Sequence, residues 1–123
     1  MAVAIKRIYE PALAADGTRI LVDRLWPRGV SKARAKLALW IKEIAPSPKL
    51  RVWFGHRPDR FREFGRRYKI ELTHNPALGE LRRLARRKRV TLLYGAHDPQ
   101  INHAAVLQSI LGGRSARAPP KAP

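Results

Sequence analysis

Two short polar segments of this chain have the residue types of a ligand-binding site. The first is Asp-Arg-Leu-Trp-Pro-Arg-Gly at residues 23–29, directly after the apolar run of residues 20–22. The second is residues 94–102, directly after another run of mostly apolar residues, 90–93. Each segment places charged and aromatic side chains where a buried strand would end, and ligand sites of α/β proteins often lie there. Together they predict a crevice at one edge of a sheet.

The two arginines of the first segment suit an anionic group. Arg24 and Arg28 have guanidinium groups that can form paired hydrogen bonds with a phosphate or a carboxylate. Trp26 can stack on a ring, and Asp23 can orient an arginine. A structural interpretation is equally open, in which Asp23 pairs with an arginine, Trp26 fills the core and Pro-Arg-Gly makes a turn.

The second segment supplies a possible proton-transfer pair and a helix start. His97 and Asp98 have the side chains for proton transfer, although an Asp before a Pro also commonly starts a turn. Asn102 is a suitable N-cap for a helix whose amide groups would favour an anion. The candidate ligand-binding residues are Asp23, Arg24, Trp26, Arg28, Tyr94, His97, Asp98 and Asn102.

The histidines give no sign of a metal site. The chain has four His and no Cys, and their spacing matches no known metal-binding pattern. His56 is expected either to line the crevice or to cap a helix, whereas His74 and His103 are expected on helix surfaces or caps. Because the sequence also lacks a Gly-rich phosphate loop and a nucleophile elbow, it indicates neither a cofactor nor a particular reaction.

The composition predicts one cytoplasmic globular domain. A length of 123 residues with 45% hydrophobic residues is typical of a single domain. The absence of cysteine excludes disulfides and fits a reducing compartment. The N-terminal apolar run is too short for a signal peptide, and no apolar stretch approaches the ~18–20 residues of a membrane span. The composition indicates no oligomeric state.

The charge of the chain raises a second hypothesis. A formal net charge of +17 attracts polyanions, although arginine can also accumulate on a solvated surface without such a role. Residues 57–89 hold twelve basic residues against four acidic ones. The alternative function is therefore low-specificity nucleic-acid binding, without any recognised DNA- or RNA-binding motif. The residues that would carry it are Arg82, Arg83, Arg86 and Arg87.

The apolar pattern predicts strands at residues 3–9, 18–25 and 90–96. The helical middle of the chain, residues 31–88, is long enough to join the second and third strands as parallel neighbours. The loop between the first two strands is short. We therefore expect those two to be antiparallel neighbours or to meet only through the edge of the sheet.

Capping residues predict the helices. Ser31 is expected to start a helix with apolar residues as far as Ile44, ended by the Pro-Ser-Pro sequence of residues 46–48. A short helical turn is expected at residues 49–55. Longer helices are expected to start at Pro58, at Asn75-Pro76 and at Asn102.

The sequence thus predicts a single small α/β domain over residues 1–112. Its short, partly parallel sheet is expected to be packed with helices. Residues 113–123 are basic and rich in proline, and are expected to form a flexible tail.

The run of residues 17–29, Gly-Thr-Arg-Ile-Leu-Val-Asp-Arg-Leu-Trp-Pro-Arg-Gly, resembles the signature of the YeaO-like family of uncharacterised bacterial proteins. The similarity covers nearly all of residues 3–111. It continues through Trp40, residues 42–47, 50–51, 53–56 and 92–94, and ends in residues 102–107. The resemblance implies a small cytoplasmic α/β domain with no assigned activity, and it supplies no catalytic residues. The strong basicity and the residues after Gly113 lie outside the family pattern.

Overall fold

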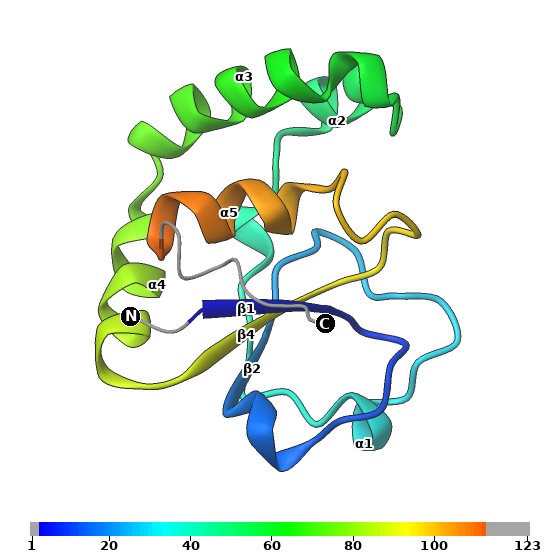
Figure 1. Cartoon of the computed structure of the whole chain (residues 1–123), viewed down its shortest axis with the longest axis vertical. Helices are drawn as coiled ribbons and strands as arrows, with labels where there is room; N and C mark the ends of the chain where they lie inside the picture. The colour runs from blue at the N-terminus through cyan, green and yellow to red at the C-terminus, as the bar shows by residue number, and fades with distance from the viewer. Residues whose placement is uncertain (1–2, 113–123) are drawn as a thin grey trace, which may run out of the picture.

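The computed structural model describes residues 3–112 as a four-stranded parallel sheet with helices packed on it (Figure 1). Its strand order is β1-β4-β2-β3, and every neighbouring pair is parallel. The strands are β1 (Val3–Arg7), β2 (Thr18–Leu21), β3 (Leu39–Trp40) and β4 (Val90–Tyr94). The predicted single small α/β domain is confirmed, with a sheet that is wholly parallel. The predicted flexible tail lies outside the described residues.

The second and third predicted strands are parallel neighbours, as expected, with Ile20 of β2 opposite Leu92 of β4. Of the two alternatives for the first two strands, antiparallel pairing is wrong, and the two strands are not direct neighbours. Strand β4 lies between β1 and β2, and all three run in the same direction. The physical reason is that β4 is buried along its whole length, so its backbone needs a hydrogen-bonding partner on both sides.

One face of the sheet carries the main hydrophobic core, to which four helices contribute. These helices are α2 (Pro48–Phe54), α3 (Phe61–Thr73), α4 (Pro76–Arg87) and α5 (His103–Leu111). Figure 1 shows α5 between the sheet and the outer pair α2 and α3. Buried side chains of α3, such as Phe64 and Tyr68, reach this core beside Ile20 and Leu92 of the sheet.

Side-chain oxygens cap the starts of α2 and α4; Asn75 was predicted to do so, whereas Ser47 was not. The Ser47 hydroxyl accepts a hydrogen bond from the Leu50 N–H at the start of α2. The Asn75 side chain accepts one from the Ala77 N–H at the start of α4. Short 3-10 turns complete the chain: η1 (Ala14–Asp16), η2 (Lys42–Ile44) and η3 (Pro58–Arg60). The last of these leads directly into α3, so the helix expected from Pro58 begins as a 3-10 turn.

The other face of the sheet carries a smaller core around Leu21 and Leu93. It is covered by loops and by the short helix α1 (Lys32–Ala35), which Figure 1 shows on the side of the sheet away from α2 and α3.

The helix predicted over residues 31–44 is wrong beyond its first turn. Ser31 does cap a helix, but α1 ends at Ala35 because Lys36 adopts a left-handed conformation with φ 47°. Residues Leu39–Trp40 instead form the edge strand β3, and the Trp40 indole N–H donates to the Asp23 carbonyl at 2.7 Å. The apolar residues of this stretch are shared between the two cores: Ile41 and Ile44 belong to the main core, and Leu37 and Trp40 pack against the smaller one. Their spacing resembles that of a helix although they do not lie on one.

A buried ionic cluster lies beside the start of β2. Asp16 is 7% exposed, and its carboxylate accepts hydrogen bonds from Lys6 Nζ at 3.0 and 3.2 Å and from Arg19 Nη1 at 2.6 Å. The Leu13 N–H donates to the same carboxylate at 3.0 Å. Burial alone would raise the pKa of Asp16, but these hydrogen bonds and the two cations outweigh it and lower the pKa below the ordinary value of 3.8.

Candidate functional site

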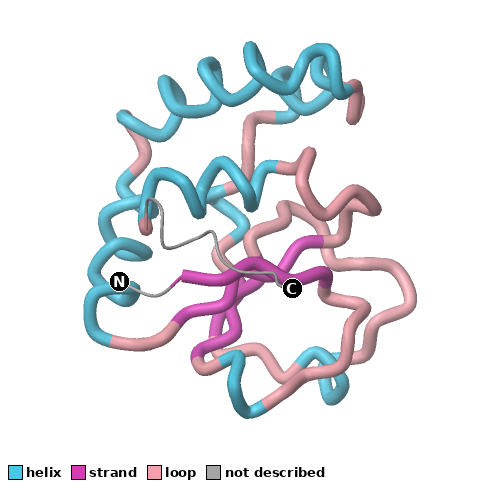
Figure 2. The backbone as a smooth tube through the Cα atoms, in the orientation of Figure 1, coloured by secondary structure: helices cyan, strands magenta, loops and turns pink. Residues whose placement is uncertain are grey.

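A pocket of about 620 Å³ lies where β2 and β4 end. The loops that follow these two strands lie on the same side of the molecule, on the right in Figure 2. They meet α2, α3 and the start of α5 around the pocket. It is lined by Asp23, Arg24, Leu25, Ala45, Pro46, Arg51, Phe54, His56, Phe64, Gly95, Ala96, His97, Asp98, Asn102 and His103. The predicted crevice at the carboxyl edge of the sheet therefore has a physical counterpart.

Asp23 joins the two strand ends at the base of the pocket. Its Oδ2 accepts a hydrogen bond from the Gly95 N–H at 2.9 Å. Its Oδ1 lies 3.2 Å from His103 Nε2. That nitrogen is also 3.0 Å from the Val22 carbonyl, which can only accept, so Nε2 carries the proton. Asp23 thus acts first as a positioning residue between neighbouring strands.

Arg24 brings a partly satisfied guanidinium to the pocket wall. Its Nη2 donates to the carbonyls of Ala45 and Pro46, both at 3.2 Å. Its Nε is buried and has no hydrogen-bond partner among residues 3–112. Arg51 of α2 is exposed, and its side chain makes no ion pair within the same residues. The pocket is therefore lined by one exposed guanidinium without an ion pair, that of Arg51, and by one partly satisfied guanidinium, that of Arg24.

Asp98, in the loop after β4, accepts hydrogen bonds from the main chain of the same loop. Asp98 Oδ1 accepts hydrogen bonds from the N–H groups of Gln100 and Ile101 at 2.8 and 2.9 Å. Hydrogen bonds from the Ile101 and Gln100 N–H groups lower the pKa of Asp98, so it is ionised and holds a turn. The expectation of a turn at this Asp-Pro sequence agrees with this geometry.

Asn102 fixes the start of α5 at the pocket. Its Oδ1 accepts from the Ala105 N–H at 2.8 Å, and its Nδ2 donates to the Asp98 carbonyl at 2.8 Å. The first turn of α5 therefore opens on the pocket beside His103. A helix start carries partial positive charge, which favours a bound anion.

Part of the remaining wall is apolar. Phe54 of α2 and Phe64 of α3 stack with their ring centroids 4.1 Å apart. Leu25 lies on the loop after β2 and is 64% exposed at the pocket. A pocket with apolar walls and a few convergent polar groups is the usual form of a small-molecule site.

Comparison with known proteins shows the family. A family model described as the inactive DUF488-N3 subclade matches residues 2–122. The chain belongs to this subclade. An uncharacterised protein of Mycobacterium tuberculosis is 45% identical over 112 residues, which cover 91% of this chain and 95% of that relative. The uncharacterised protein YeaO of Escherichia coli is 44% identical over 108 residues, which cover 87% of this chain and 94% of the relative.

The similarity to YeaO confirms the family resemblance found in the sequence. No solved structure matches the chain.

In this member of the DUF488-N3 subclade, the pocket contains some of the residues predicted from sequence and excludes others. Those that line it are Asp23, Arg24, His97, Asp98 and Asn102. Trp26 does not line it, because its indole N–H donates to the Val30 carbonyl at 2.7 Å and its ring packs edge-on against Trp40. Arg28 lies outside it on an exposed turn, where its carbonyl accepts from the Tyr9 hydroxyl at 3.0 Å.

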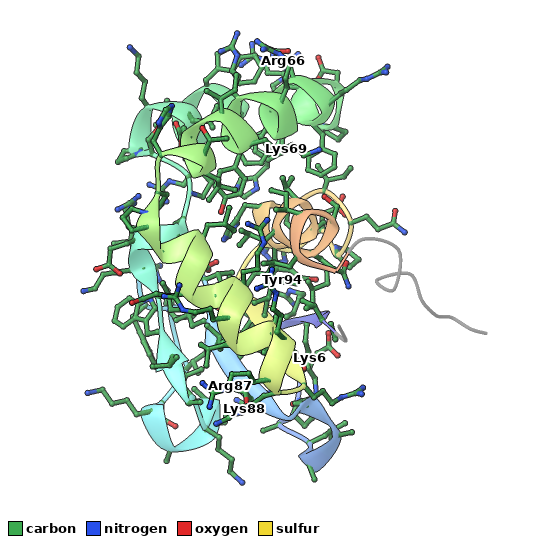
Figure 3. The ribbon with its side chains drawn as sticks, turned by 90° about the vertical axis from the view of Figure 1, so that its left-hand side faces the viewer. Lys6, Arg66, Lys69, Arg87, Lys88 and Tyr94 are labelled. Atoms are coloured by element: carbon green, nitrogen blue, oxygen red, sulfur yellow. The ribbon has the colours of Figure 1, made fainter. Side chains whose placement is uncertain are left out.

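Tyr94 does not line the pocket. Its side chain is 2% exposed and belongs to the main core, between the sheet and α5 (Figure 3). Burial raises the pKa of Tyr94, so its hydroxyl stays protonated at neutral pH.

Several lining residues were not predicted. His103 was expected on a helix surface or cap, but it is only 16% exposed in its side chain and lies against Asp23. Arg51 and Phe54 belong to α2 and also line the pocket. No local sequence pattern indicates that α2 lies beside the strand ends. His56, expected either to line the crevice or to cap a helix, lines the pocket. The presence of Arg51 could have been inferred only by knowing that α2 packs over the strand ends.

Three of the four histidines thus line one pocket, at positions 56, 97 and 103. Within residues 3–112, however, no group of three or more His, Cys, Asp or Glu side chains has a geometry that could hold a metal ion. The same residues contain no helix long and apolar enough to cross a membrane.

The arginines of the alternative hypothesis lie on α4. Arg83, Arg86 and Arg87 are exposed, whereas Arg82 is partly buried. None of these arginines forms an ion pair with another residue in the described range 3–112. Figure 3 shows Arg87 and Lys88 at the end of α4, with Arg66 and Lys69 on α3 further along the same view. On α3, by contrast, Arg66 and Arg67 both pair with Glu63.

Proposed function

We propose that this protein binds a small ligand bearing a phosphate or a carboxylate in the pocket at the ends of β2 and β4. The observation that carries the proposal is which of the charged side chains lining the pocket already have hydrogen-bond partners in the protein. Asp23 Oδ2 and Asp98 Oδ1 accept hydrogen bonds from main-chain N–H groups, and Asp23 Oδ1 lies against His103. The exposed guanidinium of Arg51 has no acceptor among residues 3–112, and neither has the buried Nε of Arg24. Arg51 is therefore the lining group best suited to recognise an anion, with Arg24 beside the same pocket.

The position of the pocket supports the same conclusion. It lies beyond the carboxyl ends of neighbouring parallel strands, where open α/β sheets bind ligands. Its volume of about 620 Å³ is within the range of small-molecule sites. The family description as inactive favours a binding role over a catalytic one. A cytoplasmic location belongs to the same proposal, because a chain without cysteine fits a reducing compartment.

The test uses phenyl phosphate and benzoate as anionic probes, with benzyl alcohol as the neutral probe. The chain carries a net charge of +17, so the measurements need at least 100 mM salt to screen bulk attraction. We expect both anions to raise the melting temperature of the protein and benzyl alcohol to leave it unchanged. Titration calorimetry then gives the affinity.

Two variants that remove the same single charge separate the pocket from bulk electrostatics. Arg51→Gln should weaken anion binding about tenfold, because an arginine–anion pair in a partly enclosed site contributes roughly 1–2 kcal/mol. Arg28→Gln, at an exposed position outside the pocket, should change the affinity for the anion less than twofold. Arg24→Lys keeps the charge but loses the forked guanidinium, and should also weaken binding. Equal effects of Arg51→Gln and Arg28→Gln would overturn the proposal.

The second candidate function is nucleic-acid binding through α4. Its specific support is that Arg83, Arg86 and Arg87 are exposed and unpaired within the described part of the chain. Such arginines can contact a phosphate backbone without reading its sequence. The binding would depend steeply on salt and only weakly on base sequence.

This candidate is tested by fluorescence anisotropy with labelled RNA and DNA at low and near-physiological salt. Neutralising Arg83, Arg86 and Arg87 together to Gln should flatten the dependence of log affinity on log salt concentration by about two to three units. The matched control changes three exposed lysines elsewhere, Lys32, Lys36 and Lys49, to Gln. If both triple variants flatten the slope equally, the binding is due to net charge alone and α4 has no particular role.

A further inference from the structure

The pocket has more apolar surface to offer than a bare anion can use. Phosphate occupies the space of a few water molecules, each about 30 Å³ in liquid, whereas the pocket measures about 620 Å³. The cationic side chains that line it are Arg24 and Arg51. Polar residues and Gly95 form part of the wall, and its apolar part is formed by Leu25, Ala45, Pro46, Phe54, Phe64 and Ala96.

Leu25 is the unusual member of this wall. The large hydrophobic side chains that are exposed within residues 3–112 are Leu13, Leu25, Leu39, Val52 and Ile70. Of these, Leu25 alone lines the pocket beside Arg24. It follows Arg24 directly in the loop after β2, so the same short segment presents a cation and an exposed apolar group. An exposed leucine of this kind gains free energy when a ligand covers it.

We propose that the ligand is an amphiphilic anion, with its phosphate or carboxylate at Arg24 and Arg51 and an apolar body that covers Leu25. This inference rests on the anion-binding function proposed above and adds the chemical class of the ligand. Leu25 is then a residue that determines specificity. Its side chain selects anions that carry a ring or an alkyl chain over small hydrophilic anions.

The experiment compares inorganic phosphate with phenyl phosphate by titration calorimetry on the full-length chain. Phenyl phosphate should bind at least tenfold more tightly, because the ring covers apolar wall that phosphate leaves exposed. Leu25→Ser should weaken binding of phenyl phosphate about five- to tenfold and that of inorganic phosphate less than twofold. Leu25→Met should keep the affinity of the unmodified protein, since it keeps the apolar contact.

Leu13→Ser is the matched control, because Leu13 is 58% exposed and does not line the pocket. It should leave both affinities unchanged. Both leucines are exposed, so neither serine variant should lower the melting temperature of the free protein by more than a few degrees.

The outcomes separate the two proposals. If neither anion binds, the anion-binding function itself fails. If both bind equally well, or if Leu25→Ser weakens them by the same factor, the function stands and the amphiphilic ligand is excluded. If Leu13→Ser has the same effect as Leu25→Ser, the preference for phenyl phosphate arises from general surface hydrophobicity and the inference fails.

Discussion

The two ends of β2 carry aspartates in opposite situations. Asp16, before the strand, is surrounded by Lys6, Arg19 and the Leu13 N–H, and its carboxylate is fully used within the protein. Asp23, after the strand, is held by Gly95 and lies against His103, but it borders a pocket. Both its Oδ1 and the neighbouring Arg24 Nε lack a hydrogen-bond partner among residues 3–112. Similar residue types therefore form a closed ionic cluster at one end of β2 and line a pocket at the other.

The difference comes from what covers each end. At Asp16, the loop of residues 8–16 and helix α1 close over the cluster, and Arg19 donates through Nε to the Ala35 carbonyl at 2.9 Å. Only Arg19 Nη2 is left there without an acceptor among residues 3–112. At Asp23, α2 and the start of α5 stand apart and leave space. The Asp16 carboxylate is therefore satisfied by protein donors on both oxygens, whereas Asp23, within the same residues, accepts a hydrogen bond on Oδ2 only and borders a pocket.

The largest expected effect comes from Asp16→Asn. The change leaves Lys6 and Arg19 buried without their counter-charge, and breaking a buried ion pair in this way costs about 3–5 kcal/mol. Urea unfolding should show this loss in the free energy of unfolding. Asp59→Asn is the control, since Asp59 pairs with Arg57 on the surface and its loss should barely move the unfolding midpoint. A small loss of unfolding free energy in Asp16→Asn would mean that water already solvates the charges of Lys6 and Arg19, and that the ion pairs with Asp16 do not stabilise the fold.

The next effect comes from the glycines beside the two aspartates. Gly17 has φ 68°, and a Cβ added there would lie 2.6 Å from the Arg89 carbonyl oxygen. Gly17→Ala should therefore lower stability by about 2–4 kcal/mol, through backbone strain and overpacking.

A Cβ added at Gly95 meets Asp23 Oδ2, a side-chain atom, at 3.0 Å. Because the carboxylate can move into the pocket, Gly95→Ala should lower stability by only about 1 kcal/mol. The same urea unfolding measures both variants. Equal losses would contradict the view that the Asp16 end is rigid and the Asp23 end adaptable.

A smaller effect is expected from Asp23→Asn. The amide oxygen can still accept the Gly95 N–H, but the amide NH2 then lies where Oδ1 faces the His103 Nε2–H, so about 1–2 kcal/mol is lost in all. Comparison of its unfolding curve with that of Asp16→Asn gives the contrast between the two ends directly. A loss as large as that of Asp16→Asn would show that Asp23 is also an essential counter-charge.

The smallest expected effect is the change with pH in the stability that Asp16 contributes. Because the pKa of Asp16 is lower in the folded protein than its ordinary value of 3.8, the stability it contributes is complete above that value. It is lost as pH falls through the lowered folded pKa. The difference in unfolding free energy between the unmodified protein and Asp16→Asn should therefore narrow below about pH 4. A constant difference across this range would show that ionisation of Asp16 does not stabilise the fold.

Local signals predicted much of the fold correctly. Continuous apolar runs identified β2 and β4, because a strand buried on both faces has a pattern that few other elements share. Asn75-Pro76 and Asn102 marked the starts of α4 and α5, because N-capping depends on the residue at the cap and its next few neighbours. The parallel pairing of β2 and β4 followed from the length of chain between them.

The errors fall where distant contacts decide the local structure. Leu39 and Trp40 form a strand because the edge of β2 and the Asp23 carbonyl offer them hydrogen bonds, and no spacing within residues 31–44 contains that information. A two-residue strand is also too short to show alternation.

The sequence by itself determined most element types outside residues 36–44, the parallel pairing of β2 and β4, and the set of polar residues that follow these two strands. Only the tertiary structure decided which of those residues share a pocket. Arg24 faces the pocket and Arg28 lies on a turn outside it, although four positions separate them in one motif. His103, Arg51 and Leu25 acquire their roles from α2 and α5 packing across the strand ends. Side-chain direction in a loop depends on these distant surfaces, and the local sequence does not encode them.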